Sequence, residues 1–485
     1  MTRAPFRRIA AACALTVAAA CAHPAPVQPL AAPTPLSAAP NARPWSTAQL
    51  RALQRQLRAA LSASALATSG VAVVDADARP LFVRRERSAF TPASTFKLLV
   101  GATALTTLGP AFRFPTTFES VVDPHDGRID GDLYLVGSGD PTLTRDDLRG
   151  GAGTVARDGV TDVHGALVAD ATAFSGPEIN AAWDPDDLQY GYAAGTSALS
   201  LDQGTVEFHL VPTVPGAPAR IRVLPPSDAV RVAGSIITAY TTLLTIRRDA
   251  GRNDFTVDGR VAAKQSFWRP VIDLPRYAAQ AARAMLRERG VRVDDGVRLG
   301  VAPVAPLVLW RHRSPPLLAI VHEMFLESNN HFAEQLLRAV GRTIGAGTES
   351  NGSRIERELL VRDTVPQDGL RIVDGSGLAA ADRVAPITLA TLLARAAADR
   401  GGDAFVRTLP RVGIEGTVRD RKVRDALGRA RAKSGHITGV NALAGYVLTR
   451  RHGRVAFAII VNDRRADDTA VDAGIDRALD LLARS

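Results

Sequence analysis

The chain has 485 residues, of which 46% are hydrophobic, 22% are charged and 5% are aromatic, and its formal net charge is +10 at pH 7. At roughly 100 to 200 residues per domain, this length predicts more than one domain, and the hydrophobic share excludes a largely disordered chain. The basic residues are interspersed with acidic ones and aromatic stacking platforms are scarce, so we expect no nucleic-acid partner.

The N-terminus is typical of a secretory signal. Three arginines precede an apolar run at residues 9–20, which is too short to span a membrane. Residues 17–20 then resemble the cleavage box of a bacterial lipoprotein, with alanine in place of the usual leucine three residues before Cys21. We interpret residues 1–21 as a lipoprotein-type signal peptide with a lipid on Cys21. A simple Ala-x-Ala cleavage that removes Cys21 or leaves it idle is the alternative.

Residues 22–44 carry prolines among alanines and predict an extended tether that lifts a domain off a membrane. The chain has two cysteines, Cys13 and Cys21, and both lie in or at the edge of the signal. The rest of the chain therefore has no disulfide to form in an oxidising compartment. We expect a protein of the periplasm or cell envelope, attached to the outer membrane only through the lipid on Cys21.

The folded part begins with a helix and a hairpin. Leucines recur at helical spacing within residues 47–61, which predicts an amphipathic helix. Residues 70–74 and 81–83 flank a polar turn and predict a β-hairpin. The apolar run after Ser94 predicts a helix that ends at Gly109.

From about residue 111 to 290, short strand-like runs alternate with Gly, Pro and Asp, as at 132–136 and 220–224. This pattern predicts an insertion of mostly β subdomains. The glycine-rich stretch 137–143 lacks Gly-Lys-Ser/Thr, so we interpret it as a turn rather than a phosphate-binding loop. A helix is expected at 277–288.

The remaining elements alternate helices with a hairpin. Helices are predicted at 315–326, 330–340, 386–398 and 468–484, a tight turn at 374–378, and strands at 443–449 and 455–462. Strands at both ends of the chain predict one domain whose sheet is assembled from the two termini. His322-Glu323 lacks the second histidine of a zinc motif, since Leu326 stands there, so we expect no metal and no cofactor.

Lysine is rare in this chain, which otherwise uses arginine. The only lysines are Lys97, Lys264, Lys422 and Lys433. Unlike arginine, a desolvated lysine can lose its proton and act as a base. On a helix, Lys97 would lie beside Ser94, three residues earlier, as a base next to a nucleophile. A helix start with a snorkelling lysine is the alternative.

Three short motifs follow one another along the chain, and each occurs only once. They are Ser94-x-x-Lys97, Ser328-x-Asn330 and Lys433-Ser434-Gly435. In this order they are the signature of class A β-lactamases and penicillin-binding proteins.

The first two motifs suit the proton transfers of acyl transfer. Ser94 would attack the carbonyl of a terminal amide while Lys97 accepts its proton. The N-terminus of the helix adds electrostatic help. Ser328 can pass a proton to the leaving amine, and Asn330 can hold the substrate amide while it shares hydrogen bonds with Lys97.

The third motif suits substrate binding. Lys433 supplies a positive charge and Ser434 a hydroxyl for a substrate carboxylate. We expect the motif, including Gly435, on or beside an edge strand against which a substrate peptide lies. The backbone N–H groups of Ser94 and His436 would then form an oxyanion hole, a role we favour over a catalytic imidazole.

Between residues 70 and 462 the chain closely resembles the class C low-molecular-mass penicillin-binding proteins, the D-alanyl-D-alanine carboxypeptidase/endopeptidase family. Besides the three motifs, the matching stretches are Gly139-Asp140-Pro141, Ser197-Ala198-Leu199-Ser200-Leu201, Asp374-Gly375-Ser376-Gly377-Leu378, residues 409–421 and Asn441-x-x-Ala444-Gly445. Members of this family carry domains inserted between the first two motifs, which serine β-lactamases lack.

The resemblance implies an α+β fold of the serine β-lactamase/penicillin-binding-protein transpeptidase type. An antiparallel sheet with helices and an all-helical subdomain would be formed by residues 45–110 and 291–485, with residues 111–290 inserted. It also implies cleavage of D-Ala-D-Ala ends, or of D-D cross-links, in peptidoglycan stem peptides through an acyl-enzyme on Ser94. β-Lactams would acylate the same serine.

The chain departs from the family pattern in two places. The third motif of the family usually reads Lys-Thr-Gly, and Ser434 keeps the hydroxyl and loses only the methyl group, so we expect it to be tolerated. The family continues Asp-Gly-Ser-Gly-Leu with Ser-Arg, whose arginine is thought to hold a diaminopimelate carboxylate, whereas this chain has Ala379 and Ala380. Our hypothesis is that Arg383, three residues on, substitutes in part. Asp140 matches the family position thought to meet the diaminopimelate amine.

Two other functions remain as alternatives. A serine β-lactamase or esterase needs a group that activates water, for which Glu323 and Glu327 are candidates near Ser328. A non-catalytic peptidoglycan-binding envelope protein would use the inserted domains, but it would have no need of the complete set of motif residues. The lifetime of the penicilloyl-enzyme and activity on D-Ala-D-Ala peptides discriminate between these functions.

Overall fold

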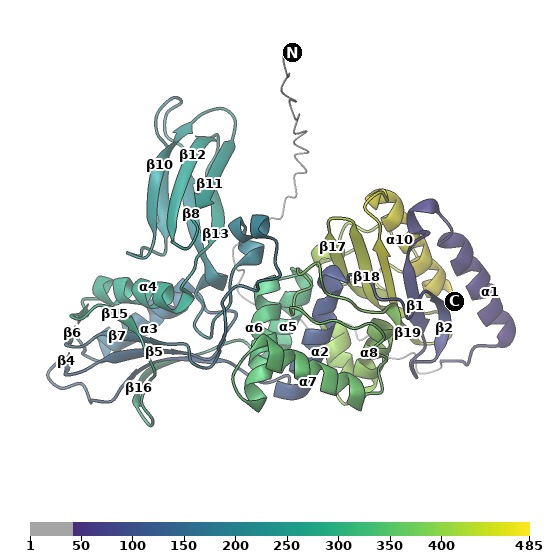
Figure 1. Cartoon of the computed structure of the whole chain (residues 1–485), viewed down its shortest axis with the longest axis horizontal. Coiled ribbons are helices and arrows are strands. Elements are labelled where there is room, and N and C mark those ends of the chain that lie inside the picture. The colour runs from purple at the N-terminus through teal and green to yellow at the C-terminus, as the bar shows by residue number, and fades with distance from the viewer. Residues whose placement is uncertain (1–41) are drawn as a thin grey trace, which may run out of the picture.

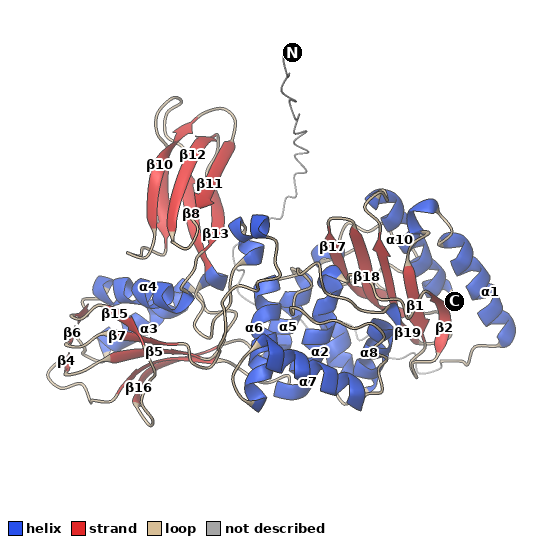
Figure 2. Cartoon of the chain, in the orientation of Figure 1, coloured by secondary structure: helices blue, strands red, loops and turns tan. Residues whose placement is uncertain are grey.

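The computed structural model describes residues 42–485 (Figures 1 and 2). The predicted signal peptide, the lipid site at Cys21 and nearly all of the predicted tether at 22–44 lie outside the described residues, so they stay predictions. Within 42–485, no helix combines the length and apolarity needed to cross a membrane.

A five-stranded antiparallel sheet joins the two ends of the chain, with strand order β17-β18-β19-β1-β2. Its strands are β1 (Gly70–Val74), β2 (Pro80–Arg84), β17 (Ala430–Ile437), β18 (Val440–Leu448) and β19 (Arg454–Asn462). Ala72 of β1 pairs with Ala458 of β19, so the first hairpin completes the sheet begun by the last strands. The prediction of a sheet assembled from both termini is confirmed.

Helices cover both faces of this sheet. One face packs against α1 (Thr47–Ala60) and α10 (Asp468–Arg484), and the other against α8 (Pro386–Ala398). Val71 and Val73 face the first pair of helices, whereas Ala72 and Val74 belong to the cluster with α8. This alternation follows from the two-residue period of a strand, and it explains why β1 is apolar throughout.

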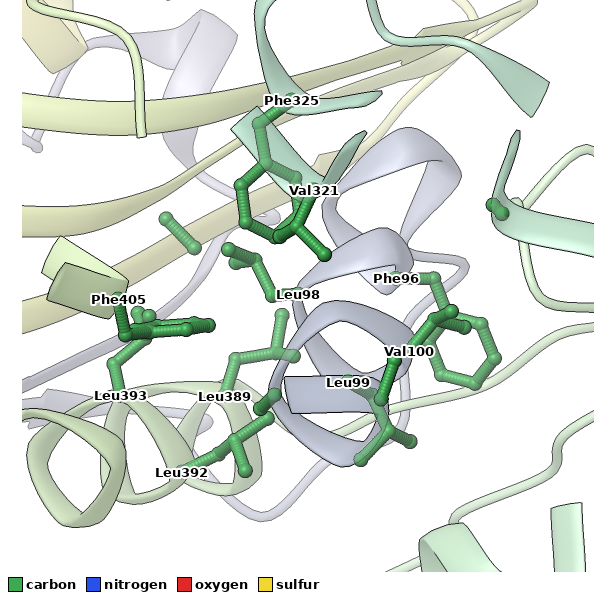
Figure 3. Packing of buried hydrophobic residues seen from close by; sticks show 14 of the residues in the cluster. Phe96, Leu98, Leu99, Val100, Val321, Phe325, Leu389, Leu392, Leu393 and Phe405 are labelled. Carbon is green, nitrogen blue, oxygen red and sulfur yellow. The ribbon is translucent and has the colours of Figure 1, made fainter. Parts of the chain in front are cut away.

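A helical part lies between the sheet and the insert (Figure 1). It contains α2 (Lys97–Leu108), α5 (Leu317–Leu326), α6 (Asn330–Gly341), α7 (Glu349–Arg362) and α9 (Gly402–Thr408). Helix α2 is its centre: Leu98 is fully buried and lies between Val321 of α5 and Leu389 of α8 (Figure 3). The turn that precedes α2 is thereby held in a packed core.

The first unit of the insert is a mixed α/β layer rather than mostly β. Its sheet has the order β15-β7-β5-β3-β16, with a smaller sheet β14-β6-β4 beside it. Its elements are β3 (Pro115–Ser120), β4 (Arg128–Ile129), β5 (Leu133–Gly137), α3 (Arg145–Arg157), β6 (Asp162–Val163), β7 (Leu167–Asp170), α4 (Leu274–Glu288), β14 (Arg292–Val293), β15 (Val297–Leu299) and β16 (Leu307–Arg313). Because β16 pairs with β3, the insert ends near residue 313 and not at the predicted 290.

The second unit of the insert consists of strands, as predicted. Its two sheets have the orders β13-β8-β9 and β10-β12-β11. The strands are β8 (Thr205–Val211), β9 (Arg220–Leu224), β10 (Arg231–Thr238), β11 (Leu243–Arg248), β12 (Asp254–Val261) and β13 (Gln265–Pro270). Phe208 and Phe255 pack edge to face between the two sheets, with ring centroids 5.0 Å apart.

Residues 171–204, here called the connecting segment, join β7 to β8. Its regular structure is limited to the short 3₁₀ turns η3 (Pro185–Gln189), η4 (Gly191–Ala193) and η5 (Asp202–Gly204). Loops of this length inside a compact domain usually serve a function. This one reaches α6, where the Gly195 carbonyl lies 3.1 Å from Nδ1 of His331.

Candidate active site

Ser94 lies in a tight turn at the start of the most buried helix. The 3₁₀ turn η2 (Ala93–Phe96) carries it, and α2 begins at Lys97. Ala93 has φ of 47°, a left-handed conformation that is uncommon for a residue other than glycine and that clusters at functional sites. Phe96 is fully buried and anchors the turn in the core. The predicted helix thus starts three residues after the serine, yet the two motif side chains still meet.

Lys97 is fully buried and makes three short contacts through Nζ. The distances are 2.9 Å to Oγ of Ser94, 2.6 Å to Oδ1 of Asn330 and 2.8 Å to the carbonyl of Ser376. A neutral amine has two N–H groups and one lone pair. The amide and carbonyl oxygens accept the two N–H groups, and the Ser94 hydroxyl can donate to the lone pair. These contacts are therefore complete for Lys97 as a free base.

The electrostatics of Lys97 agree with this geometry. Burial lowers the pKa of Lys97 to about 7, although the carboxylates of Asp374, Glu334 and Asp382 oppose the shift. At neutral pH, roughly half of the amine is then unprotonated and able to accept the serine proton. The alternative interpretation of Lys97 as a snorkelling surface lysine is wrong, because its side chain has no exposure.

A buried glutamate shapes the turn behind Lys97. Oε1 of Glu334 accepts the backbone N–H groups of Gly375 and Ser376 at 3.0 and 2.8 Å. Asp374 accepts the N–H of Gly377 at 2.6 Å. These bonds turn the Ser376 carbonyl toward Lys97, so the turn predicted at 374–378 contacts the lysine of the first motif. Burial, together with the neighbouring Asp374, raises the pKa of Glu334 to about 8.

The second motif occupies the predicted break between two helices. Helix α5 ends at Leu326 and α6 begins at Asn330, with Asn329 capping α6 through a 3.1 Å bond from the Phe332 N–H to its Oδ1. Ser328 is left-handed, with φ of 58°. Besides its contact with Lys97, Asn330 donates through Nδ2 to the Tyr192 carbonyl at 2.9 Å. Asn330 therefore links the lysine to the insert.

The third motif lies on the edge strand β17, as predicted. An added Cβ at Gly435 would lie 2.7 Å from the Pro92 carbonyl oxygen and 3.0 Å from the Ser94 nitrogen. Only glycine lets the strand pass this close to the nucleophile turn. The hydroxyl oxygens of Ser434 and Thr417 are 2.7 Å apart.

Lys433 is fully buried, and its Nζ donates to the Ser434 carbonyl at 2.7 Å. Burial, together with the charge of Lys97, lowers its pKa well below the ordinary value for lysine. The ring of His436 is engaged elsewhere, since Nδ1 lies 2.8 Å from Oδ1 of Asn441. The role of the His436 backbone N–H in an oxyanion hole stays a prediction.

The structure does not bring Asp140 to this group. Its side chain is 2% exposed, Oδ1 accepts the N–H of Thr142 at 2.8 Å, and Oδ2 lies 3.3 Å from Nε2 of His312. Burial lowers the pKa of His312, but the hydrogen bond to Asp140 and the charge of Asp147 outweigh burial and raise it overall. Asp140 therefore has its partners within the insert in this structure, and its predicted contact with a substrate amine stays a prediction.

Arg383 is close to the departure from the family pattern. Its NH1 donates to the carbonyl of Ala380 at 2.7 Å and to Oγ1 of Thr91 at 2.8 Å, just before the Ser94 turn. Ala379 is fully buried in a cluster with Trp183 of the connecting segment. The guanidinium of Arg383 therefore lies beside the position where the family has its arginine, and its role toward substrate stays a prediction.

Sequence reasoning missed the contribution of the connecting segment. The rings of Tyr190 and Tyr192 stack with centroids 5.5 Å apart and are substantially exposed, and the Tyr192 carbonyl holds Asn330. The length of this strand-poor segment was the available signal. Thr417 was also missed as a site residue, although it follows Gly416 inside a stretch that matches the family.

Metal and acid candidates outside the motifs do not join the site. Residues 42–485 contain no group of three or more His, Cys, Asp or Glu side chains that could hold a metal ion. Nδ1 of His322 lies 3.0 Å from the carbonyl of Thr408. In the described part of the chain, no hydrogen bond or ion pair joins the side chain of Glu323 or Glu327 to a motif residue.

A serine hydroxyl in contact with a buried lysine whose pKa is lowered to about 7, at the edge of an antiparallel sheet, is the arrangement of a serine acyl-transfer enzyme of the penicillin-binding type. The sequence model of the D-Ala-D-Ala carboxypeptidase 3 (S13) family matches residues 53–485. The chain therefore belongs to this family, and the predicted resemblance is confirmed.

Individual relatives agree. The chain is 35% identical over 461 residues to the D-alanyl-D-alanine carboxypeptidase of Actinomadura sp. (strain R39), covering 90% of this chain and 85% of that protein. Penicillin-binding protein 4 (dacB) from Haemophilus influenzae has the same fold, with a TM-score of 0.77 at 24% identity over 90% of this chain and 99% of that chain. The structure of the same protein in complex with a β-lactam has a TM-score of 0.72 at 23% identity, over 89% of this chain and 99% of that chain. The fold prediction is confirmed.

Proposed function

We propose that this chain is a serine-type D-alanyl-D-alanine carboxypeptidase that acts on peptidoglycan stem peptides through an acyl-enzyme on Ser94. The observation that carries the proposal is the contact of Lys97 Nζ with Oγ of Ser94 at 2.9 Å and with Oδ1 of Asn330 at 2.6 Å, in a site where burial lowers the pKa of the lysine to about 7. Such a lysine is a base at neutral pH.

In the acylation step, Lys97 takes the proton from the Ser94 hydroxyl as Oγ attacks the carbonyl carbon of the penultimate D-alanine. The developing oxyanion faces the backbone N–H groups of Ser94 and His436. The close approach of β17 at Gly435 to the Ser94 nitrogen supports this arrangement. The peptide C–N bond then breaks, and Ser328 gives its hydroxyl proton to the departing D-alanine amine while it receives the proton held by Lys97. This relay returns Lys97 to the free base, and the acyl group stays on Oγ.

In the deacylation step, a water molecule attacks the ester carbonyl while the same lysine accepts its proton. The C–O bond to Ser94 breaks, Oγ regains a proton, and the shortened stem peptide leaves as a carboxylic acid. Attack by water rather than by a second peptide amine makes the reaction a hydrolysis. The D-D bond of a peptidoglycan cross-link has the same chemistry, so endopeptidase action uses the same steps.

The third motif binds the terminal carboxylate of the substrate. Lys433 is buried beside Lys97 with a depressed pKa, and an arriving carboxylate stabilises its charged form. The hydroxyl groups of Ser434 and Thr417 lie 2.7 Å apart and offer the same carboxylate hydrogen bonds. A β-lactam presents a strained amide next to a carboxylate, so it enters as a substrate analogue and acylates Ser94.

The envelope is where this substrate is found, and the predicted signal peptide is consistent with export. We propose that the mature chain is held at the envelope by a lipid on Cys21. Mass analysis of the mature N-terminus tests this point: a diacylglycerol-modified Cys21 supports it, and a free N-terminus at residue 21 or 22 contradicts it.

The function is tested by incubating the purified protein with peptidoglycan sacculi and with a stem peptide ending in D-Ala-D-Ala, and identifying the products by mass. Wild type is expected to release D-alanine, and Ser94→Ala is expected to release none. Ser62→Ala is a matched control, because Ser62 is exposed and its hydroxyl bonds only the Ala59 carbonyl, at 2.8 Å. Release by Ser94→Ala at the wild-type rate would contradict the proposal.

A further inference from the structure

Helix α6, which carries Asn330, docks on the connecting segment through a row of polar side chains. Asn330 donates to the Tyr192 carbonyl at 2.9 Å, Nδ1 of His331 lies 3.1 Å from the Gly195 carbonyl, and Gln335 donates to the Ser197 carbonyl at 2.9 Å. All three contacts are to main-chain oxygens of the insert. The helix lies on the side of the helical part that faces the insert (Figure 1).

A fourth contact, at the residue that caps α6, joins two side chains. Nδ2 of Asn329 donates to Oε1 of Gln203 at 2.7 Å. Asn329 stands between Ser328 and Asn330, and its other amide atom, Oδ1, already accepts the Phe332 N–H at 3.1 Å. The cap therefore settles which way the Asn329 amide points, and it leaves Nδ2 facing Gln203.

Gln203 is held in an unusual backbone turn. Asp202, Gln203 and Gly204 are all left-handed, with φ of 47°, 59° and 69°. Backbone in this conformation persists at non-glycine residues only when its surroundings over-determine it, and such sites concentrate around functional groups. Here the surroundings are a partly buried arginine and two buried acids.

Arg145 of α3 is the residue that fixes the turn. Its backbone N–H donates to Oδ1 of Asp202 at 3.0 Å and its Nε lies 2.7 Å from Oδ2 of the same carboxylate. Its NH1 lies 3.0 Å from Oε2 of Glu207 on β8. Both acids are almost completely buried, so the turn that presents Gln203 is anchored in the core of the insert.

Two left-handed turns therefore face each other across the boundary between insert and peptidase. One carries Gln203, the other carries Ser328 with φ of 58°, and the Gln203–Asn329 hydrogen bond joins them. Nothing in the three motifs requires a particular residue at 329. The hydrogen bond gives this position a structural role, because it ties the flank of Ser328 to a rigid part of the insert.

We propose that Gln203 is a positioning residue for the peptidase reaction, which acts through Asn329 to place the Ser328 hydroxyl for proton transfer to the leaving amine. The inference rests on the proposed function. It assigns the insert a part in catalysis, since a side chain from the insert sets the geometry of a motif in the helical part. Because Ser328 acts in the transition state, the effect belongs in kcat rather than in KM.

The test compares kcat and KM for release of D-alanine from diacetyl-L-lysyl-D-alanyl-D-alanine by four proteins: wild type, Gln203→Met, Gln203→Glu and the control Gln54→Met. Methionine keeps the length of the side chain and removes the acceptor, so kcat should fall about tenfold to a hundredfold with KM nearly unchanged. Gln203→Glu keeps an acceptor oxygen and should recover most of the loss. Gln54 bonds the Leu81 carbonyl far from the site and tests the loss of one glutamine hydrogen bond elsewhere.

A double-variant cycle tests the contact itself. Asn329→Asp keeps the cap oxygen, and the Gln203 amide can turn to donate to it. In the Gln203→Glu background two carboxylates would face each other, so Asn329→Asp should cost at least about ten times more there than in wild type. Melting temperatures of all variants separate this effect from a general loss of folding. Gln203→Glu and Asn329→Asp each keep a hydrogen bond between the two side chains, so the result of the cycle does not depend on Gln203→Met being stable.

The outcomes are distinct. If wild type releases no D-alanine, the proposed function fails. If wild type is active and Gln203→Met keeps the wild-type kcat, or Gln203→Glu is as slow as Gln203→Met, or the double variant is merely additive, the positioning role of Gln203 is overturned while the proposed function stands.

Discussion

The peptidase core and the connecting segment both hold Asn330, but they do so with different kinds of contact. On the core side, Oδ1 accepts from Lys97, a fully buried amine with three short contacts. On the other side, Nδ2 donates to the main-chain carbonyl of Tyr192, next to exposed aromatic rings. The core supplies the ionisable groups and the desolvation that tunes them, whereas the insert supplies main-chain oxygens and geometry. The difference predicts that changes in the core act on proton transfer and stability, and that changes at the insert act on positioning and substrate preference.

The largest effect is expected from Lys97→Arg. The guanidinium stays charged in any protein site, so it cannot accept the Ser94 proton and the base is lost. The second-order rate constant for acylation by a fluorescent penicillin should fall on the order of 100- to 10,000-fold. Lys422→Arg, at an exposed lysine of the same chain, should acylate at the wild-type rate. A Lys97→Arg protein that acylates within about threefold of wild type would exclude this lysine as the base.

Much of the peptidase part could be predicted because its signals are local. Helices α8 and α10 have the bounds that their apolar runs and end signals indicated: α8 is buried all round over residues 386–394, and α10 buries one face. The motif residues could be paired because the spacing of three in Ser94-x-x-Lys97 survives a start in a 3₁₀ turn.

The insert was harder to predict because its contacts are non-local. Strand β16 pairs with β3, which lies far from it in the chain. No local sequence pattern predicts this pairing or its register. Asp140 stood in a predicted glycine-rich turn, and its partner His312 is distant in sequence, so their pairing could not be predicted. The contact of Asn330 with Tyr192 is made by the main-chain carbonyl, which every residue has. The type of residue at position 192 therefore could not predict this contact.

A second prediction contrasts packing in the core with exposure at the insert. Leu98→Ala removes a fully buried side chain between α5 and α8 and should lower the free energy of unfolding by about 2–5 kcal/mol. Tyr190→Ala removes a half-exposed ring and should change it by less than about 0.5 kcal/mol. Urea unfolding of the two variants measures the contrast. Equal losses would mean that the connecting segment is as much a part of the folding core as α2.

A third prediction concerns pH. The folded-state pKa of Lys97 is about 7, lowered from the ordinary lysine value by burial, and only the unprotonated amine accepts the Ser94 proton. The acylation rate constant should therefore fall about tenfold for each pH unit below 7 and level off above it. Stopped-flow acylation between pH 5 and 9 measures this dependence. A flat profile across pH 5 to 8 would show that Lys97 is not the titrating base.

The smallest effect is expected from Arg383→Ala. The NH1 of Arg383 is tied to the Ala380 carbonyl and Thr91, and the proposed substrate contact uses the rest of the guanidinium. Hydrolysis of a stem peptide containing diaminopimelate should slow by about 3- to 10-fold, while a peptide with lysine in that position should be affected less. Equal rates for wild type and Arg383→Ala on the diaminopimelate peptide would end the idea that Arg383 replaces the missing arginine.

The central claim is that Ser94 becomes covalently acylated with Lys97 as its base. Intact-mass measurement of the wild-type protein after incubation with benzylpenicillin, followed by peptide mapping, tests it most directly. We predict a single adduct with the mass of the whole antibiotic, located on Ser94 and absent from Ser94→Ala. No adduct on wild type, or an adduct mapped to any other residue, would contradict it.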